Sequence, residues 1–195
     1  MGGALARFAE RGISGGRASI DASASAGRAA ALAGHVGLMR EGRPAIVAAS
    51  AGRVSRSLEF IIETNLLSAG LGHGGNTLPA AQGIHDALAS ICPHRPLLDG
   101  ERAAFGTVPL LLLADRPTTE IEEAIDFLLD LGLPATLADL GLADIATASL
   151  EEAAAAALQQ GGPLCALALP LSAGFVADAI RTASRLAEQR LRRAA

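Results

Sequence analysis

Small aliphatic side chains dominate the apolar half of this sequence, and this feature most limits the folds open to it. Half of the 195 residues are hydrophobic, 43 of the 195 are alanine, and five phenylalanines are the only aromatic residues. Such residues suit closely packed helices, whereas strands are enriched in β-branched and aromatic residues. Where apolar residues recur regularly, they have helical spacing, and no segment shows the alternation of apolar and polar residues that is typical of a strand. The sequence therefore predicts an all-α fold in a single domain over residues 1–195, with the weakest signals in residues 1–55.

Composition also disfavours several classes of function. The sixteen basic residues are all arginine, the formal net charge is −4, and tryptophan and tyrosine are absent, so the sequence lacks the features of a nucleic-acid-binding protein. The longest apolar stretch, near residues 108–114, is too short to span a bilayer. Cys92 and Cys165 form neither a metal knuckle nor a disulfide framework, and a single disulfide between them stays an alternative. We expect a cytoplasmic protein that binds neither nucleic acid nor a membrane.

Helix boundaries follow from glycines, prolines and capping residues. The region Gly12–Gly27 is expected to be a loop or a weak helix, and Thr118 or Thr119 is expected to cap the helix that follows it. The predicted helices cover Leu5–Arg11, Ala29–Glu41, Pro44–Asn65, Pro79–Ile91, Gly100–Ala114, Glu120–Leu131, Ala135–Leu140, Ser149–Gln160 and Ser172–Arg193.

Several motifs occur in a fixed order along the chain. They are Met1–Leu5, Leu67–Gly72, Ala80–Asp86, Gly100–Thr107 and Gly132–Leu140. In the same order they match the MGDAL, LSGxG, AAHAxHNG, HGEKVAFGT and GLPxTLxxL segments of glycerol dehydrogenases, so the sequence resembles this family of metal-dependent, iron-containing alcohol dehydrogenases. The resemblance covers nearly the whole chain and is weakest over residues 12–55. It implies the fold of the family's C-terminal helical domain.

The resemblance also predicts what the chain lacks. In the family, the MGDAL segment opens the helical domain, which follows a Rossmann-like domain that holds the dinucleotide. This sequence begins at that segment, and none of its glycines lies between a legible strand and a helix. We therefore expect a stand-alone domain without a nucleotide-binding domain. NAD and zinc or iron are implied by the resemblance alone, and we expect no cofactor in the isolated chain.

The family's metal ligands have no full equivalent here. The resemblance places the three ligand positions, occupied in the family by one Asp and two His, on Gly3, Gln82 and Asp99. Glycine has no ligand atom and a neutral amide is a poor ligand for zinc or ferrous iron, so only Asp99 is competent. The sequence predicts a dismantled metal site.

Polar residues at the same motifs form the candidate site. Gln82, His85 and Asp99, with His73, are the candidate ligand-pocket residues, because the resemblance places the first three around the old active-site cavity. A metal site rebuilt from His73, His85 and Asp99, with His94 as a further ligand, stays an alternative. His85 and Asp99 are also the candidate catalytic residues, because an imidazole titrates near neutral pH and can act as a general base.

Three functional hypotheses follow. The first is a metal-free pseudoenzyme that binds a small molecule or another protein, including a second copy of itself, through surface exposed by the absent domain. The second is an enzyme with metal-independent chemistry that uses His85 and Asp99. The third is the C-terminal half of a split NAD-dependent alcohol dehydrogenase, completed by a separate nucleotide-binding subunit.

Overall fold

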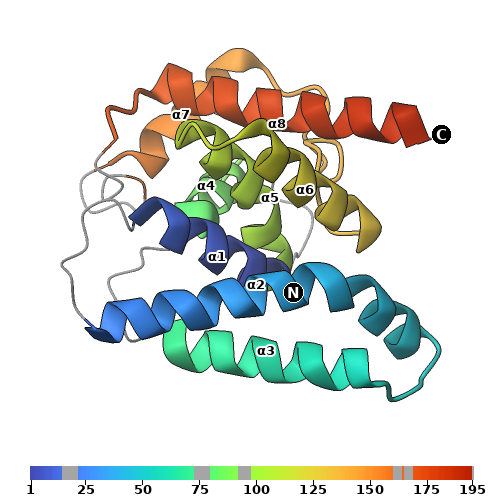
Figure 1. The fold of residues 1–195 in the computed structure, drawn as a ribbon. Helices are drawn as coiled ribbons and strands as arrows, with labels where there is room; N and C mark the ends of the chain where they lie inside the picture. The colour runs from blue at the N-terminus through green and yellow to red at the C-terminus, as the bar shows by residue number, and fades with distance from the viewer. Residues whose placement is uncertain (15–21, 73–79, 92–97, 160–163, 165–168, 195) are drawn as a thin grey trace.

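The computed structural model describes residues 1–14, 22–72, 80–91, 98–159, 164 and 169–194. These residues form helices and no strand, which confirms the predicted all-α fold (Figure 1). The helices are α1 (Gly2–Ser14), α2 (Ala22–Ser50), α3 (Arg56–Gly72), α4 (Ala80–Ala89), α5 (Asp99–Leu113), α6 (Thr118–Asp130), α7 (Thr147–Ala157) and α8 (Ala173–Ala194).

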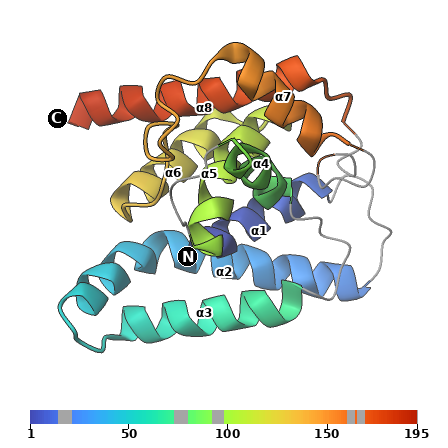
Figure 2. The same cartoon turned by 180° about the vertical axis from the view of Figure 1, so that it is seen from behind.

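Helix α5 is the central element of the fold. It contacts α1, α4, α6 and α8, and all residues from 103 to 111 are buried. Helices α2 and α3 pair as a long hairpin along one side of the molecule, and α7 and α8 lie on the opposite side (Figures 1 and 2). Helix α3 therefore packs on α2 and α1, and α7 packs on α8 and α4.

Two clusters of buried apolar side chains meet on α5. One contains Phe105 and Leu110 of α5 with residues of α4, α7 and α8. The other contains Val108 and Leu111 of α5 with residues of α1, α2 and α6. Because α5 is covered on several sides, it has no exposed stripe between residues 103 and 111.

The small residues of the sequence allow very close helix approach. At Gly106 of α5, an added Cβ would overlap the backbone carbonyl of Ala81 in α4. Backbone atoms cannot swing aside as a side-chain end can, so this crossing requires glycine. The abundance of small residues is thus a packing requirement at the α4–α5 contact.

Glycines in left-handed conformation end two of the helices. After α2, Gly52 has φ +63°, and the N–H groups of Gly52 and Arg53 donate to the carbonyls of Ala49 and Ala48. After α6, Gly132 has φ +64°, and the same pair of bonds closes the helix end. Glycine takes this conformation without the steric cost that a Cβ imposes.

The predicted division between Ala29–Glu41 and Pro44–Asn65 is wrong. Helix α2 continues through Pro44, and the break lies between Ser50 and Arg56. Pro44 is exposed, whereas its neighbours Gly42 and Ala45 are buried, and Gly42 lies against the ring of Phe127. Packing of that face therefore outweighs the local cost of a proline in the helix.

The predicted helix over Ala135–Leu140 is also absent; this segment forms a bend and turns. Its backbone has other partners, because the carboxylate of Asp139 accepts the N–H groups of Ala135 and Thr136, and the hydroxyl of Ser184 accepts that of Leu137. Side-chain acceptors of this kind compete with helical hydrogen bonds.

One smaller expectation also fails, and for a second the helical alternative holds over part of the segment. The N-cap residue of α6 is Pro117 and the helix shows no side-chain cap, so neither Thr118 nor Thr119 serves as the predicted cap. Residues 22–27, expected in a loop or weak helix, belong to α2. The rest of that expected loop lies partly in the end of α1 and partly in residues 15–21, which are outside the described residues.

Candidate functional site

The first turns of α1 and α5 are in backbone contact. A Cβ added at Gly2 would overlap the carbonyl oxygen of Gly100, and a Cβ added at Gly3 would lie 3.8 Å from the Cα of Gly100. Gly3 is one of the positions expected to correspond to a family metal ligand, and Asp99, another, is the residue before Gly100 and the first of α5. The structure therefore brings these two backbone positions together.

Arg7 occupies the space beside Gly3. It follows Gly3 by one helical turn, and its Nη2 lies 3.7 Å from the position that a Cβ on Gly3 would take. Its side-chain Nε is buried and has no hydrogen-bond partner among the described residues. A guanidinium nitrogen thus lies beside Gly3, one of the positions that the resemblance assigns to a metal ligand.

Glu10 links the same face of α1 to α4. Only 4% of its surface is exposed, and its Oε1 accepts the backbone N–H of Ala81 at 3.0 Å. Burial raises the pKa of this carboxyl to about 7, although its hydrogen bonds with the backbone of Ala81 and Ala80, and the charge of Arg7, act in the opposite direction. The carboxyl is therefore partly protonated near neutral pH.

His85 is the predicted site residue that the structure describes most fully. It is 4% exposed on α4, and its Nδ1 is buried without a hydrogen bond to any described group. An oxygen of Asp86 lies 3.7 Å from this nitrogen, beyond hydrogen-bond distance. Burial lowers the pKa of the ring, while the charge of Asp86 opposes that shift, so the imidazole is neutral near pH 7.

Contacts along α5 place these groups around one junction. Gly100 meets the start of α1, Arg102 lies 3.9 Å from Asp86 of α4, and Gly106 meets Ala81 at the start of α4. Helices α1 and α4 therefore flank the first half of α5, and His85 lies at the level of Arg102. We name the group Gly3, Arg7, Glu10, His85 and Arg102 the α1–α4–α5 junction.

The other candidate residues are described only in part. Gln82 lies on α4, one turn before His85, and Asp99 begins α5, but their side chains are outside the description. His73 and His94 fall outside the described residues, as do Cys92 and Cys165. The structure thus places Gln82 and His85 on α4 and Asp99 at the start of α5, two helices in contact, and the role of His73 stays a prediction.

The described residues do not fit the metal that the family resemblance implies. Gly3 offers no ligand atom, and the guanidinium beside it would repel a divalent cation. Within the described part of the chain, no three His, Cys, Asp or Glu side chains are placed to share a metal ion. We therefore derive no chemical step through a metal at this position.

Arg7 and Glu10 were missed by the sequence analysis. With Gly3 they are spaced by four and three residues, so they share one face of a helix. This helical spacing is the signal in the sequence that points to Arg7 and Glu10. The family's ligand position by itself points only to Gly3.

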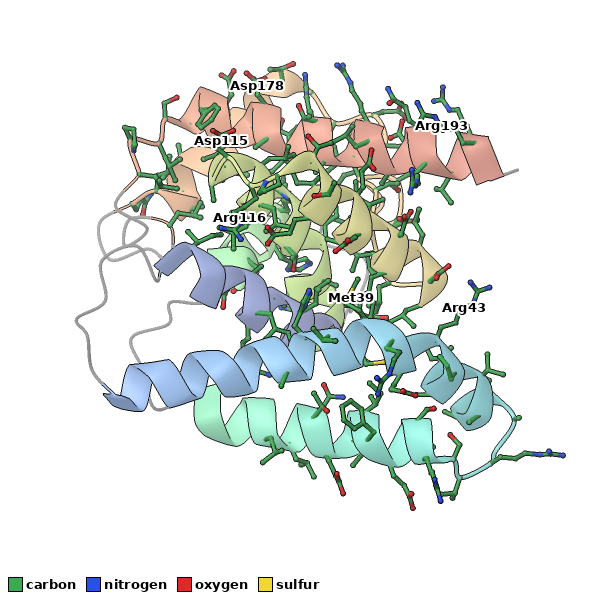
Figure 3. All side chains as sticks on the ribbon, in the orientation of Figure 1. Met39, Arg43, Asp115, Arg116, Asp178 and Arg193 are labelled. Atoms are coloured by element: carbon green, nitrogen blue, oxygen red, sulfur yellow. The ribbon has the colours of Figure 1, made fainter. Side chains whose placement is uncertain are left out.

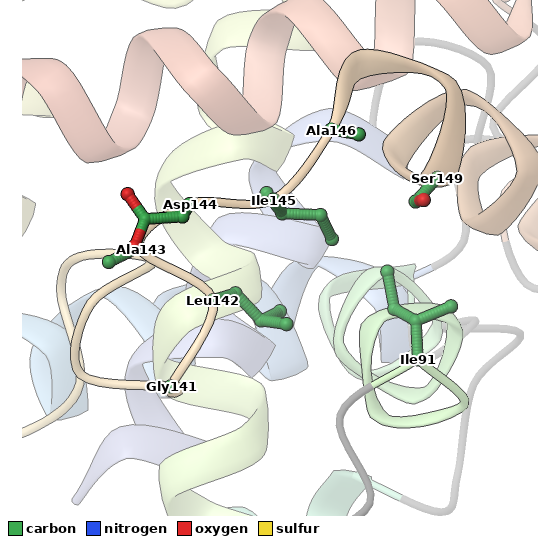
Figure 4. A pocket seen from close by; sticks show the side chains of 8 residues that line it. All are labelled: Ile91, Gly141, Leu142, Ala143, Asp144, Ile145, Ala146 and Ser149. Atoms are coloured by element: carbon green, nitrogen blue, oxygen red, sulfur yellow. The ribbon is translucent and has the colours of Figure 1, made fainter.

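A second feature, also not predicted, is a shallow surface hollow of about 540 Å³ beside α7 (Figure 4). It is lined by Ile91, Gly141, Leu142, Ala143, Asp144, Ile145, Ala146 and Ser149. Its polar side chains are those of Asp144 and Ser149, and neither has the burial of a built binding site. Separately, none of the described helices combines the length and apolar character needed to cross a lipid bilayer.

Sequence comparison identifies relatives with a named activity. No protein-family model matches the chain. It is 35% identical to glycerol dehydrogenase of Citrobacter freundii over 156 residues, which are 80% of this chain and 43% of that protein. It is 34% identical to glycerol dehydrogenase of Thermotoga maritima, covering 70% of this chain and 38% of that protein. The chain thus spans less than half the length of these curated relatives.

Solved structures give the same result. A probable glycerol dehydrogenase from Sinorhizobium meliloti superposes with a TM-score of 0.84 at 35% identity, over 96% of this chain and 54% of that one. Glycerol dehydrogenase from Schizosaccharomyces pombe gives a TM-score of 0.85 at 27% identity, over 99% of this chain and 51% of that one. The chain belongs to the glycerol dehydrogenase family, in which it corresponds to the C-terminal helical part.

Proposed function

We propose that this chain is a glycerol-dehydrogenase-like module that binds a small molecule or another protein and does not itself oxidise alcohols. The observation that carries the proposal is the pairing of Gly3 with Arg7, since a side chain without ligand atoms and an adjacent cation both oppose a divalent metal ion. Metal-assisted alcohol oxidation needs that ion to polarise the alcohol oxygen.

The direct test is an activity assay on the purified 195-residue chain with glycerol and NAD, with and without added Zn²⁺ or Fe²⁺. We expect no NADH formation and no tightly held metal in a native mass spectrum. NADH formation that depends on added metal would refute the proposal.

An exposed apolar surface supports the protein-interaction form of the proposal. On the α2–α3 hairpin, Ile62, Leu66 and Leu67 are 50%, 68% and 62% exposed. Contiguous apolar surface of this kind is typical of protein contacts, including homo-oligomers. Light scattering on the wild type and on a Leu66→Glu variant tests self-association, which we expect the substitution to reduce.

The chemistry of His85 favours a second candidate, a metal-independent enzyme. A buried, neutral imidazole whose Nδ1 has no hydrogen bond to a described residue can accept a proton, and Asp99 begins the helix that α4 packs against. If the chain turns over any substrate, a His85→Ala variant that keeps its circular dichroism spectrum should lose the activity. Retained turnover in this variant would exclude this role of His85.

A third candidate is the C-terminal half of a split NAD-dependent dehydrogenase, because the chain matches less than half the length of its relatives. The chain matches 43% of the Citrobacter enzyme. Co-expression with a separate nucleotide-binding subunit would then give an NAD-dependent activity that neither chain has alone. The absence of a metal ligand at Gly3 ranks this candidate below the module.

A further inference from the structure

The α2–α3 hairpin carries most of the large apolar side chains that the described structure exposes. Among the described residues nine such side chains are exposed, and six of them lie between residues 36 and 67. Helix α3 contributes three of the six and forms an outer edge of the molecule in both views (Figures 1 and 2). Apolar side chains that gather on one exposed element are typical of a contact surface.

One side of α3 is buried and the other faces solvent. Ile61 and Thr64 are buried, and the ring of Phe60 lies against Gly37 of α2. Between residues 56 and 67, the exposed side chains recur at helical spacing and are those of Arg56, Glu59, Ile62, Glu63, Leu66 and Leu67. Figure 3 shows side chains that project from this side of α3 away from α2. We name these six residues the outer face of α3.

The charges on the outer face are arranged in a fixed order along the helix. Arg56 begins α3, and Glu59 and Glu63 follow about one and two turns later. Within the described part of the chain, none of these three side chains forms an ion pair. A face that is positive at one end and negative further along is complementary to a second copy of itself that runs in the opposite direction.

An antiparallel pair of α3 helices satisfies these charges. Arg56 and Glu63 are two turns apart on one face, so reversing the second helix places each Arg56 opposite the Glu63 of the other copy. The same register brings Val54, which is 79% exposed just before α3, close to Leu66 of the other copy. The charged and the apolar residues therefore favour the same register.

We propose that the outer face of α3 binds the same face of a second copy of this chain, antiparallel and across a two-fold axis, with each Arg56 paired to the Glu63 of the other copy. This rests on the proposed function, because it names the protein partner of the interaction module. The overlap from residue 54 to residue 66 is about 20 Å long by the helical rise. Such a contact is at the small end of protein interfaces, so the dimer should dissociate on dilution.

Sedimentation equilibrium of the full chain over a range of concentrations tests this contact by charge reversal. We expect a monomer–dimer equilibrium for the wild type and at least about tenfold weaker dimerisation for Arg56→Glu and for Glu63→Arg, because each change creates two like-charge contacts per dimer. The double variant, Arg56→Glu with Glu63→Arg, restores opposite charges and should dimerise within about threefold of the wild type. Circular dichroism establishes that each variant is folded.

Two matched controls make the same charge changes on other helices. Arg193→Glu lies at the exposed end of α8 (Figure 3), and Glu152→Arg lies at an exposed position of α7. Both helices are on the side of the molecule opposite the hairpin, so both variants should dimerise as the wild type does. A control that weakens dimerisation as much as its α3 counterpart, or a double variant no better than the single variants, would overturn the proposal.

Glu59 tests the register itself. In the proposed antiparallel pair, the two Glu59 side chains lie near the two-fold axis, where their like charges repel each other. Glu59→Gln should therefore dimerise at least about twofold more tightly than the wild type. Unchanged or weaker dimerisation of this variant would overturn the antiparallel register.

Two outcomes separate this proposal from the proposed function. A wild type that stays monomeric at every concentration would overturn the contact between copies, whereas the NADH assay decides independently whether the chain oxidises alcohols. Dimerisation that both Leu66→Glu and Arg56→Glu leave intact would overturn the contact through α3 and leave self-association through another surface standing.

Discussion

The buried carboxyl of Glu10 makes the stability of the fold depend on pH. Its pKa is about 7 in the folded protein against an ordinary value of 4.5, so the folded state binds a proton more tightly than the unfolded state. The stabilisation is therefore fully present below about pH 4.5 and is lost as the pH rises through about 7. The shift corresponds to about 3 kcal/mol at most.

A Glu10→Gln variant should remove this dependence. The amide oxygen can still accept the N–H of Ala81, so the hydrogen bond at the start of α4 is kept without an ionisable group. Urea unfolding at pH 5 and pH 8 should show the wild type losing about 2.5 kcal/mol more than the variant over this range, slightly less than the full shift because the unfolded carboxyl is already mostly ionised at pH 5. Glu63→Gln, on an exposed position of α3, serves as the control. Parallel pH profiles for wild type and Glu10→Gln would contradict the assignment.

The contact at Gly106 should be the least tolerant glycine position in α5. A Gly106→Ala substitution places a methyl group into the backbone carbonyl of Ala81, so α4 and α5 must separate. We expect a loss of about 3 kcal/mol or more in the free energy of unfolding, measured by urea denaturation. Gly174→Ala in α8, where no atom lies within 4 Å, should be neutral or stabilising by a few tenths of a kcal/mol. Similar effects at both positions would contradict the role of Gly106.

At the scale of helices, the end of α5 departs from the pattern at the other helix ends. Asp115 has φ +50°, and the N–H groups of Asp115 and Arg116 donate to the carbonyls of Leu112 and Leu111, as at Gly52 and Gly132. An aspartate thus occupies a position at which glycine is favoured, at a cost of roughly 1 kcal/mol.

Asp115→Gly should therefore stabilise the protein by about 1 kcal/mol, which thermal and urea unfolding can measure. The opposite sign is expected for Asp178→Gly, because Asp178 lies on the exposed face of α8 and glycine disfavours helix by a few tenths of a kcal/mol relative to aspartate. Both side chains lie at the surface (Figure 3), so burial does not separate the two variants. A destabilised Asp115→Gly variant would contradict the conformational argument.

Local sequence signals predicted the helices that have strong boundaries and failed where tertiary contacts decide. The predicted bounds of the helix before Gly132 agree with those of α6 within a few residues, because the glycine that ends this helix is a local signal. Pro44 misled the prediction, because the packing of Gly42 on Phe127 joins residues 85 positions apart. Likewise, Ser184 of α8 accepts the N–H of Leu137 and so helps to hold the segment near Asp139 out of a helix.

At the scale of the whole molecule, the candidate site was predictable only through the family. The positions of Gly3, Gln82 and Asp99 lie on three different helices, of which α1 is distant in sequence from α4 and α5, and no spacing rule joins them. The resemblance brought them together, and the contact of Gly3 with Gly100 agrees with that grouping. Arg7 could not be assigned a role from the sequence, because its significance depends on the space that Gly3 leaves beside α5.

Restoring the family's ligands tests whether Arg7 opposes a metal ion. A triple variant, Gly3→Asp with Gln82→His and Asp99→His, supplies the ligand types that the resemblance implies. The Cβ on Gly3→Asp meets Nη2 of Arg7 at an ordinary contact distance of 3.7 Å, so the new carboxylate would pair with the guanidinium. Adding Arg7→Ala to the triple variant removes that competing partner and the repulsion towards the metal ion.

We therefore expect the fourfold variant to bind Zn²⁺ at least about tenfold more tightly than the triple variant, in a competition titration against a chromophoric chelator. The matched control adds Arg43→Ala to the triple variant, which removes an exposed arginine and should leave its zinc affinity unchanged. Equal zinc affinity with and without Arg7 would show that the lost ligands alone account for the loss of the metal site. A lower zinc affinity only when Arg7 is present would show that its guanidinium opposes a metal ion at this position.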